Sequence, residues 1–344
     1  MPTLAAEPLR TLVTNIFIAA GTPADIAPHV AKSLVESDLV GHESHGVVRV
    51  RQYLDAIRKG DMDPAARPTI IAESGSVFTV DACRGFGQLA AGWTMQQAIT
   101  RAKQQGIAAA ALVNCGHVGR LGEWVELAAD ADCVALAFCT GGGATGAVTP
   151  YGGAQRLLGT NPIAASLPLG HHAPMILDFA TSAVAEGKVR VARNRGKSIP
   201  EGWVLNAAGQ PTTDPNDLYN GGMLLPFAAY KGYALSLLVE LLAGVLTGNG
   251  TPVLPGYRPG NGVLFIVLDI AAFGPLDAYR AVSGQVADRV KAVPPAPGFS
   301  EVLLPGEPEQ RMAAARSVDG VPVDDATWQL LAEDAAHFGV TLPA

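Results

Sequence analysis

The sequence predicts an α/β protein whose two chain ends, residues 1–68 and 305–344, form one helical domain beside an α/β body over residues 69–304. The order of patterns predicts this arrangement, because helical spacing dominates both ends and strand-like runs alternate with helical ones between them. Composition agrees: 49% of the 344 residues are hydrophobic and 16% are charged, which supports a large core and argues against extensive disorder.

Helices are expected first along the chain. Apolar residues at helical spacing begin near Leu9, a cap at Thr22 with Pro23 starts a second helix that runs towards Leu39, and a third covers Val47–Lys59. The body should contain strands at Thr69–Ala72, Val77–Val80, Ile107–Val113, Cys133–Cys139 and Gly262–Asp269, and helices at Gln88–Gln105, Gly122–Ala131 and Leu235–Leu246. A helix over Asp324–Phe338 closes the chain.

Charge and cysteine content exclude several classes of protein. A formal charge of −7 is unlike the basic face of a nucleic-acid-binding protein, and an anionic substrate would therefore need a local cationic site. The four cysteines form no CxxC pair and no zinc-finger spacing, so they are expected to be reduced. The apolar run Leu235–Leu246 contains Glu240 and is too short to span a bilayer. We expect a cytoplasmic protein with no membrane or nucleic-acid partner.

Two glycine-rich segments match dinucleotide-binding fingerprints in part, and both lack the required context. Gly141–Gly146 follows a strand, but Pro150 prevents the helix that should come next, and the first acid is Asp178, too far on to bind a ribose. Gly85–Ala90 precedes a helix, yet the next strand ends at Asn114 rather than at an acid. Turn glycines are the favoured interpretation of both, so a nicotinamide cofactor would have to bind through another architecture.

Residues with useful chemistry gather around His45. Ser44 precedes it, and a helix starting at Gly46 would place Arg49 and Tyr53 on one face because they are four residues apart. An arginine holds a carboxylate through two hydrogen bonds and a histidine donates a proton to a carbonyl oxygen, which is what a 2-oxo acid requires. Spacing alone leaves a structural interpretation equally open, with Ser44 as a helix cap and Arg49 as a surface cation.

A second candidate histidine follows the buried strand Ile107–Val113. His117 lies in a glycine-punctuated loop, Asn114–Gly122, where α/β proteins often place ligand groups, although a histidine without a role is also possible there. Asp178 ends an apolar run and could orient a histidine. Ser44, His45 and Asp178 could also be read as a hydrolase triad, but no G-x-S-x-G elbow is present.

Four further polar residues are of a type that binds ligands. Lys188 and Lys231 each adjoin a glycine and are candidate phosphate contacts. His171 and His172 form a turn pair with no acid or thiol at ligand spacing, so we expect them to face solvent and predict no metal site.

Several segments, in order along the chain, resemble the signatures of the malate/L-lactate dehydrogenase family of non-Rossmann type. They are Gly41–Gly46, Asn114–Gly122, Thr149–Gly153, Gly159–Pro162, Leu177–Ser182, Pro211–Pro215, Lys231–Ala234 and Leu304–Glu307. The resemblance covers nearly the whole chain and is strongest to the hydroxycarboxylate dehydrogenase B branch. The family also includes ureidoglycolate dehydrogenase and reductases of piperideine-2-carboxylate.

The resemblance implies a homodimer with a non-Rossmann NAD(P)-binding domain. It implies His45 as proton donor with Ser44 and Asp178 as relay partners, although some members use the histidine matching His117, and it places Arg49, with Tyr53, at the substrate. The implied cofactor residues are His45, Gly119, Arg120, Leu121, Thr140, Leu177, Asp178, Phe179, Lys188, Lys231, Pro305, Gly306 and Glu307. The loop Thr140–Thr145 departs from the family pattern, which leaves the choice between NADH and NADPH open.

The expected function is hydride transfer between the nicotinamide and C2 of a small 2-oxo or 2-hydroxy acid, with a histidine supplying the carbonyl proton. One alternative is a reductase of cyclic imino acids such as piperideine-2-carboxylate or pyrroline-2-carboxylate. A non-catalytic ligand-binding relative and a triad hydrolase are the others. The residues that face the substrate's side chain are not identifiable from one chain, so the sequence does not name the substrate.

Overall fold

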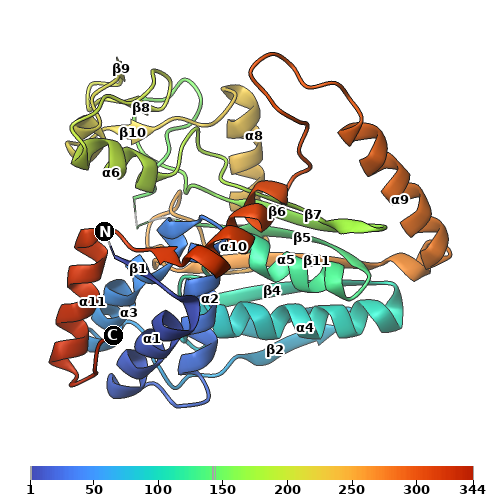
Figure 1. Ribbon diagram of the computed structural model, residues 1–344, viewed down its shortest axis with the longest axis horizontal. Helices are drawn as coiled ribbons and strands as arrows, with labels where there is room; N and C mark the ends of the chain where they lie inside the picture. The colour runs from blue at the N-terminus through green and yellow to red at the C-terminus, as the bar shows by residue number, and fades with distance from the viewer. Residues whose placement is uncertain (1, 142, 144, 344) are drawn as a thin grey trace.

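Helices from both ends of the chain pack together at one end of the molecule, beside both termini (Figure 1). The computed structural model describes residues 2–141, 143 and 145–343. These helices are α1 (Ala6–Ala19), α2 (Ala27–Leu39), α3 (Val50–Arg58), α10 (Glu307–Asp319) and α11 (Asp325–His337). The short strands β1 (Thr3–Leu4) and β12 (Val321–Pro322) pair antiparallel and join the two ends. One buried cluster contains Leu9 and Phe17 from the start of the chain and Leu331 and Ala335 from its end.

A seven-stranded mixed sheet forms the body. Its strands, in spatial order, are β2 (Thr69–Ser74), β3 (Val77–Asp81), β4 (Ile107–Cys115), β11 (Asn261–Asp269), β5 (Cys133–Cys139), β6 (Ile163–Leu169) and β7 (His172–Phe179). Only β3 and β4 run parallel. The central strand β11 is antiparallel to both neighbours, and its nearly continuous apolar sequence suits a strand covered on both faces. This is not the parallel sheet of a Rossmann fold.

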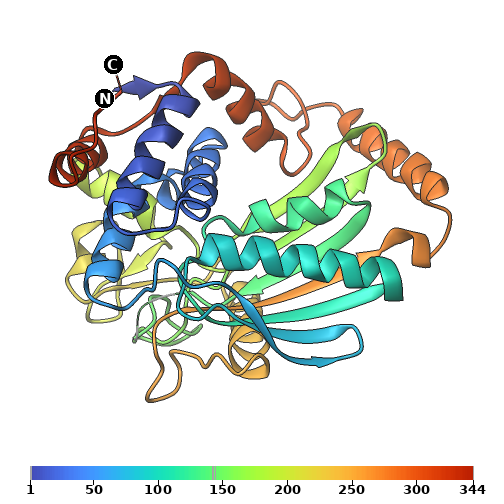
Figure 2. The ribbon, with the colours of Figure 1, turned by 90° about the horizontal axis from the view of Figure 1, so that it is seen from below.

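Helices cover both faces of this sheet. Helices α4 (Gly87–Gln105) and α5 (Leu121–Asp130) lie side by side on one face (Figure 2). On the other, α8 (Tyr230–Val239) continues into the π-helix η3 (Glu240–Leu246), which contacts β5 and β11. Helix α9 (Leu276–Lys291) packs on β6 at the far edge.

A third unit lies above the sheet in Figure 1 and has its own buried cluster, which includes Val189, Val204 and Leu224. It contains α6 (Glu186–Asn194), α7 (Asn216–Tyr219) and a small sheet of β10 (Met223–Leu224), β8 (Val204–Leu205) and β9 (Pro211–Thr212).

The predicted α/β class is confirmed, and the predicted helices and strands are present with shifted ends. Helix α2 begins at Ala27 rather than after Thr22, because residues 24–26 form a turn. The first turn of the expected helix Val47–Lys59 is a separate 3-10 turn, and the end of Leu235–Leu246 is π-helical. The four cysteines are free, and no helix in the described part of the chain is long and apolar enough to cross a membrane. The domain boundaries at residues 68 and 305 stay predictions.

Candidate active site

His45 lies in a pair of 3-10 turns, η1 (Glu43–His45) and η2 (Val47–Arg49), that rest on the end of α2. Gly46 separates the turns, and a Cβ there would overlap the carboxylate of Asp38. That carboxylate accepts a hydrogen bond from the backbone N–H of Val47 at 2.9 Å. The Oγ of Ser44 lies 3.0 Å from His45 Nδ1, so the imidazole is held by its immediate neighbour.

His117 is held from the opposite side. It follows β4, and its carbonyl packs so closely on Gly87, the first residue of α4, that a Cβ on Gly87 would overlap it. Its Nδ1 lies 2.7 Å from the hydroxyl of Tyr53, which also accepts a hydrogen bond from Gln88 Nε2 at 2.7 Å. Tyr53 is 1% exposed, so water does not compete for these contacts. When neutral His117 carries its ring proton on Nδ1 and donates it to the Tyr53 oxygen, Nε2 is unprotonated.

The two imidazoles face each other. The rings of His45 and His117 stack with centroids 5.4 Å apart and an interplanar angle of 15°. Both Nδ1 atoms are engaged, by Ser44 and by Tyr53, so both Nε2 atoms are left for a ligand. A carbonyl or hydroxyl group placed beside this pair would therefore face the Nε2 atoms of both rings.

Burial keeps both histidines neutral. Loss of solvent, followed by repulsion from Arg49, lowers the pKa of His45 to about 3. The same two causes hold the pKa of His117 well below its usual range. Burial also raises the pKa of Tyr53 to about 12, so this phenol stays protonated. At neutral pH the ligand-free pair is therefore uncharged.

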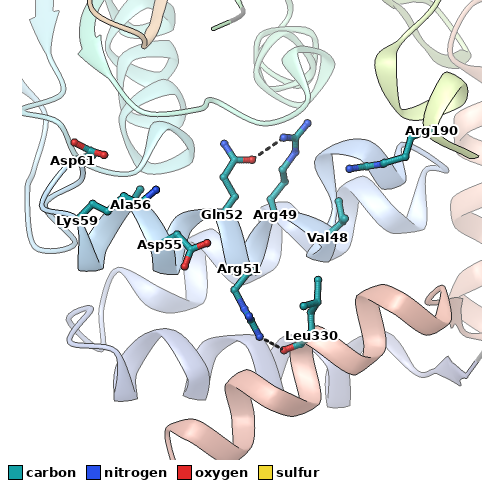
Figure 3. A pocket seen from close by; sticks show the side chains of 10 residues that line it. All are labelled: Val48, Arg49, Arg51, Gln52, Asp55, Ala56, Lys59, Asp61, Arg190 and Leu330. Atoms are coloured by element: carbon teal, nitrogen blue, oxygen red, sulfur yellow. Dashed lines mark hydrogen bonds between the residues drawn. The ribbon is translucent and has the colours of Figure 1, made fainter. Parts of the chain in front are cut away.

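Arg49 borders a cavity of about 520 Å³. Its Nε donates to the carbonyl of Ser44 at 2.6 Å and its Nη1 donates to Gln52 at 2.7 Å. The charged residues that line the cavity are Arg49, Arg51, Lys59 and Arg190 opposed by Asp55 and Asp61. Figure 3 shows Arg190 reaching from α6 towards Arg49. Cations outnumber carboxylates here, so the cavity is locally positive in a protein of charge −7, and Arg49 is the residue that connects it to the histidine pair, because neither His45 nor His117 lines it.

Asp178 has a different partner from the predicted one. Its Oδ2 accepts a hydrogen bond from the backbone N–H of Gly122 at 2.7 Å, which ties β7 to the start of α5. Within the described residues it makes no hydrogen bond to Ser44 or His45. Burial raises the pKa of this carboxyl, and the Gly122 hydrogen bond opposes that rise. The geometry therefore gives His45 a relay partner in Ser44 alone.

Three of the predicted cofactor segments meet around β7. Gly119–Leu121 leads into α5, which Asp178 holds against the strand through Gly122. Pro305 accepts a hydrogen bond from the backbone N–H of Ile176 at 3.1 Å, and Gly306 is in the left-handed region, φ +95°, against the same residue. Leu177, Asp178 and Phe179 continue β7 from this point, and the Phe179 ring is 37% exposed, edge-on to Phe227.

The other predicted cofactor residues are arranged differently. Thr140 is fully buried and its hydroxyl accepts a hydrogen bond from Gly262 N, so its side chain offers nothing to a ligand. The carboxylate of Glu307 binds Lys291 Nζ at 2.5 Å. Lys188 and Lys231 are exposed and have no carboxylate partner among the described residues. Gly187, just before Lys188, lies against Ser44, so α6 begins beside the histidine pair.

Two residues of the site were not predicted. Gln88 completes the chain to His117, and its only sequence signal is a position at the start of a helix. Arg190 joins Arg49 at the cavity although it lies far along the chain. Its only signal in the sequence is that it belongs to a segment rich in cations. Spacing in the sequence carries no information on either contact.

The glycine fingerprints have structural roles, as expected. Gly142 and Ala144 lie outside the described residues, but residues 145–185 contain no helix, so Gly141–Gly146 is not followed by the helix a Rossmann site needs. In the second segment Gly87 gives room for the His117 carbonyl. This segment does join the parallel strands β3 and β4 through α4, but the His117 carbonyl fills the space beside Gly87 and β4 does not end at an acid.

The α/β fold thus brings together two buried, oppositely held histidines and an arginine that lines a cationic cavity, groups suited to proton exchange with a small anion. Residues 4–332 match the malate/L-lactate dehydrogenase family, and the chain belongs to that family.

Individual relatives agree with this assignment. The chain is 37% identical over 340 residues to an L-lactate dehydrogenase of Cupriavidus necator, covering 97% of each protein. It is 34% identical over 342 residues to hydroxycarboxylate dehydrogenase B of Escherichia coli K12, covering 97% of this chain and 94% of the relative.

Solved structures extend the likeness to the whole fold. Sulfolactate dehydrogenase from Methanocaldococcus jannaschii superimposes with a TM-score of 0.90 at 32% identity, covering 99% of this chain and 98% of that one. Delta1-piperideine-2-carboxylate reductase from Pseudomonas syringae gives 0.86 at 32% identity, covering 97% and 100%. The predicted family and fold are confirmed.

Proposed function

We propose that this protein is an NAD(P)-dependent dehydrogenase that interconverts a small 2-hydroxy acid and its 2-oxo acid. The observation that carries the proposal is the stacked pair of His45 and His117 with Arg49 beside it. A 2-hydroxy acid offers one hydroxyl to deprotonate and one carboxylate to hold, and the site has groups for both tasks. The family relationship supports the same reaction class.

The residues around β7 fit a nicotinamide cofactor. Phe179 offers an exposed aromatic edge, Lys188 and Lys231 are cations without carboxylate partners among the described residues, and Gly119–Leu121 opens a helix N-terminus. The cofactor, when bound, supplies the hydride acceptor or donor for C2 of the substrate. We infer that Leu177–Phe179 and Pro305–Glu307 shape this site and that Thr140 contributes only to its framework.

We assign proton transfer to His117. The Tyr53 hydroxyl, itself bonded by Gln88, accepts the proton that the ring carries on Nδ1, so Nε2 has a free lone pair and is the atom that exchanges a proton with the substrate. In oxidation the neutral imidazole takes the hydroxyl proton, and in reduction the imidazolium returns it to the carbonyl oxygen. Arg49 holds the carboxylate, whose negative charge raises the pKa of the nearby imidazole and so assists proton uptake. Tyr53 positions His117 rather than contacting substrate.

Replacing each histidine separately tests the assignment. His117→Asn should lower kcat by roughly 10²- to 10⁴-fold, the contribution of a positioned acid or base, while the dissociation constant of NADH or NADPH stays unchanged. His45→Asn should cost less, and His29→Asn on α2 should cost nothing. Near-normal turnover in His117→Asn would reject the assignment, and a larger loss in His45→Asn would transfer the role to His45.

A second candidate substrate is a cyclic imino acid, because the chain superimposes well on a piperideine-2-carboxylate reductase. Its ring nitrogen would replace the carbonyl oxygen beside Nε2. Parallel NADH and NADPH oxidation assays with pyruvate-like acids, dicarboxylic 2-oxo acids and cyclic imines separate the two proposals and identify the preferred cofactor. Absence of nicotinamide-dependent turnover with every substrate would reject both.

We further propose that the protein works in the cytoplasm as a homodimer. Four free cysteines suit a reducing compartment. Exposed apolar residues on η3, among them Leu241, Val245 and Leu246, form a face that a second copy would cover. Light scattering coupled to gel filtration tests the dimer, and a mass of one chain would reject it.

A further inference from the structure

The turn between β6 and β7 points two adjacent imidazoles at one carboxylate oxygen. His171 Nε2 lies 3.2 Å and His172 Nε2 lies 2.7 Å from the same Oδ1 of Asp288. Adjacent residues of a strand point to opposite faces, but Gly170 turns the backbone through the left-handed region, φ +59°, just before the pair. Asp288 lies on α9, 116 residues beyond His172, which is why no acid is found at ligand spacing in the sequence.

Two glycines fix the distance between this turn and α9. A Cβ on Gly170 would overlap the carbonyl oxygen of Arg280, and a Cβ on Gly284 would lie 3.0 Å from His171 Nδ1. Helix and turn therefore meet backbone to backbone. Asp288 follows Gly284 by four residues, so it lies on the same face of α9, one turn further along. The convergence of the three side chains is thus built into the packing of the two elements.

We propose that His171, His172 and Asp288 form a binding site for a divalent late first-row transition metal, with Zn²⁺ as the preferred ion. Their three donor atoms, two imidazole nitrogens and one carboxylate oxygen, lie within 4.8 Å of one another. Tetrahedral Zn²⁺ binds such atoms at about 2.0–2.2 Å, which places them roughly 3–3.5 Å apart, so the two nitrogen–oxygen distances of 3.2 and 2.7 Å need little change. Imidazole donors favour zinc, nickel or copper over magnesium or calcium.

The site has room for a fourth ligand from solvent. The His171 side chain is 67% exposed and that of Asp288 is 52% exposed, so water reaches the open side, while His172 is only 21% exposed and anchors the inner side. A bound ion would join the β6–β7 hairpin to α9. One turn further along α9, Lys291 binds Glu307 at 2.5 Å. The metal would therefore brace the same helix that holds the segment around Glu307.

Calorimetric titration of EDTA-treated, tag-free full-length protein with ZnCl₂ tests the proposal. The expected result is one saturable site per chain that MgCl₂ does not occupy. Asp288→Asn and His172→Ala should each weaken zinc binding by more than the roughly 10- to 100-fold that loss of even an outer-sphere partner costs. His29→Ala and Cys83→Ser, which remove an exposed donor elsewhere, should leave it unchanged.

Thermal unfolding gives an independent measurement. Zinc should raise the Tm of the parent protein and of the two control variants, but not that of Asp288→Asn or His172→Ala, each checked for a native circular dichroism spectrum. Equal zinc affinity in Asp288→Asn and the parent, or no saturable binding by the parent, would overturn the proposal and leave a histidine–carboxylate ion pair only. If Asp288→Asn does not fold, His171→Gln with His172→Gln takes its place. Neither the calorimetric titration nor the unfolding measurement depends on the proposed dehydrogenase activity.

Discussion

Replacing Tyr53 by Phe removes a single oxygen atom and breaks two hydrogen bonds of 2.7 Å, one to His117 Nδ1 and one from Gln88 Nε2. Tyr53 is 1% exposed, so water does not replace the lost oxygen. The stranded Gln88 amide should lower the free energy of unfolding by about 1–3 kcal/mol. His117, freed at Nδ1, loses its fixed tautomer, so kcat should fall roughly 10- to 100-fold, part of the 10²–10⁴ that a positioned acid or base contributes.

Two measurements separate a role of Tyr53 in positioning His117 from a role in protein stability alone. Urea unfolding gives the first effect, and steady-state kinetics in both directions give the second. The loss in kcat/KM should be equal for oxidation and reduction, since a catalyst leaves the overall equilibrium unchanged, while the dissociation constant of the cofactor stays the same. Tyr279→Phe makes the same chemical change on α9 and should alter neither quantity. A Tyr53→Phe protein that is destabilised but turns over within about twofold of the parent would refute the role given to Tyr53.

Arg49→Gln should raise KM for the acid roughly 10- to 100-fold, because a hydrogen bond to a charged group contributes about 1.5–3 kcal/mol. Arg49→Lys should not restore the KM of the parent, because lysine lacks the planar fork of arginine. An unchanged KM of Arg49→Gln in steady-state assays would contradict carboxylate binding by Arg49. Burial lowers the pKa of His45 to about 3 and that of His117 well below its usual range, so the free enzyme holds both neutral at neutral pH. The pH profile of kcat/KM should then show no inflection near 6.5 in oxidation and a rise towards acid in reduction; a histidine-like inflection in oxidation would show that the pair titrates normally. Gly87→Ala places a methyl group on the His117 carbonyl, so it should lower the free energy of unfolding in urea by about 1–3 kcal/mol and should also lower turnover. Gly274→Ala, whose methyl group meets open space, should change neither quantity. Equal stability of the two variants would contradict the close packing at Gly87.

Local patterns predict many elements of the fold, including five of the seven strands of the large sheet, but not the arrangement of these elements. The run that forms β11 is apolar at nearly every position, and Gly106 ends α4 in the left-handed conformation, φ +83°, so both elements can be read from neighbouring residues. The position of β11 between β4 and β5 depends on partners more than a hundred residues away. Helix α9 was not predicted, and only Gly284 and Ala287 of it are buried, so no broad apolar stripe marks it as a helix.

In the site, too, residues identified by their neighbours were predicted, whereas contacts between distant elements were not. His45 and Arg49 can be identified because they lie within one short segment, and His117 because a polar loop follows a buried strand. The partners of Tyr53 and Asp178 were beyond prediction, since each is chosen by the packing of another element. Tyr53 lies on α3, just after the 3-10 turn that carries Arg49, yet its hydroxyl is occupied by His117 and Gln88.

The central position of β11 also constrains how the chain is made. Until residues 261–269 leave the ribosome, β4 and β5 have no strand between them, and each presents an unpaired edge about two strand spacings, roughly 10 Å, from the other. A nascent or truncated chain ending before Asn261 therefore exposes apolar edges that pair readily with other chains. The body of the sheet can close only late in synthesis, so folding should be slow and dependent on protection of these edges.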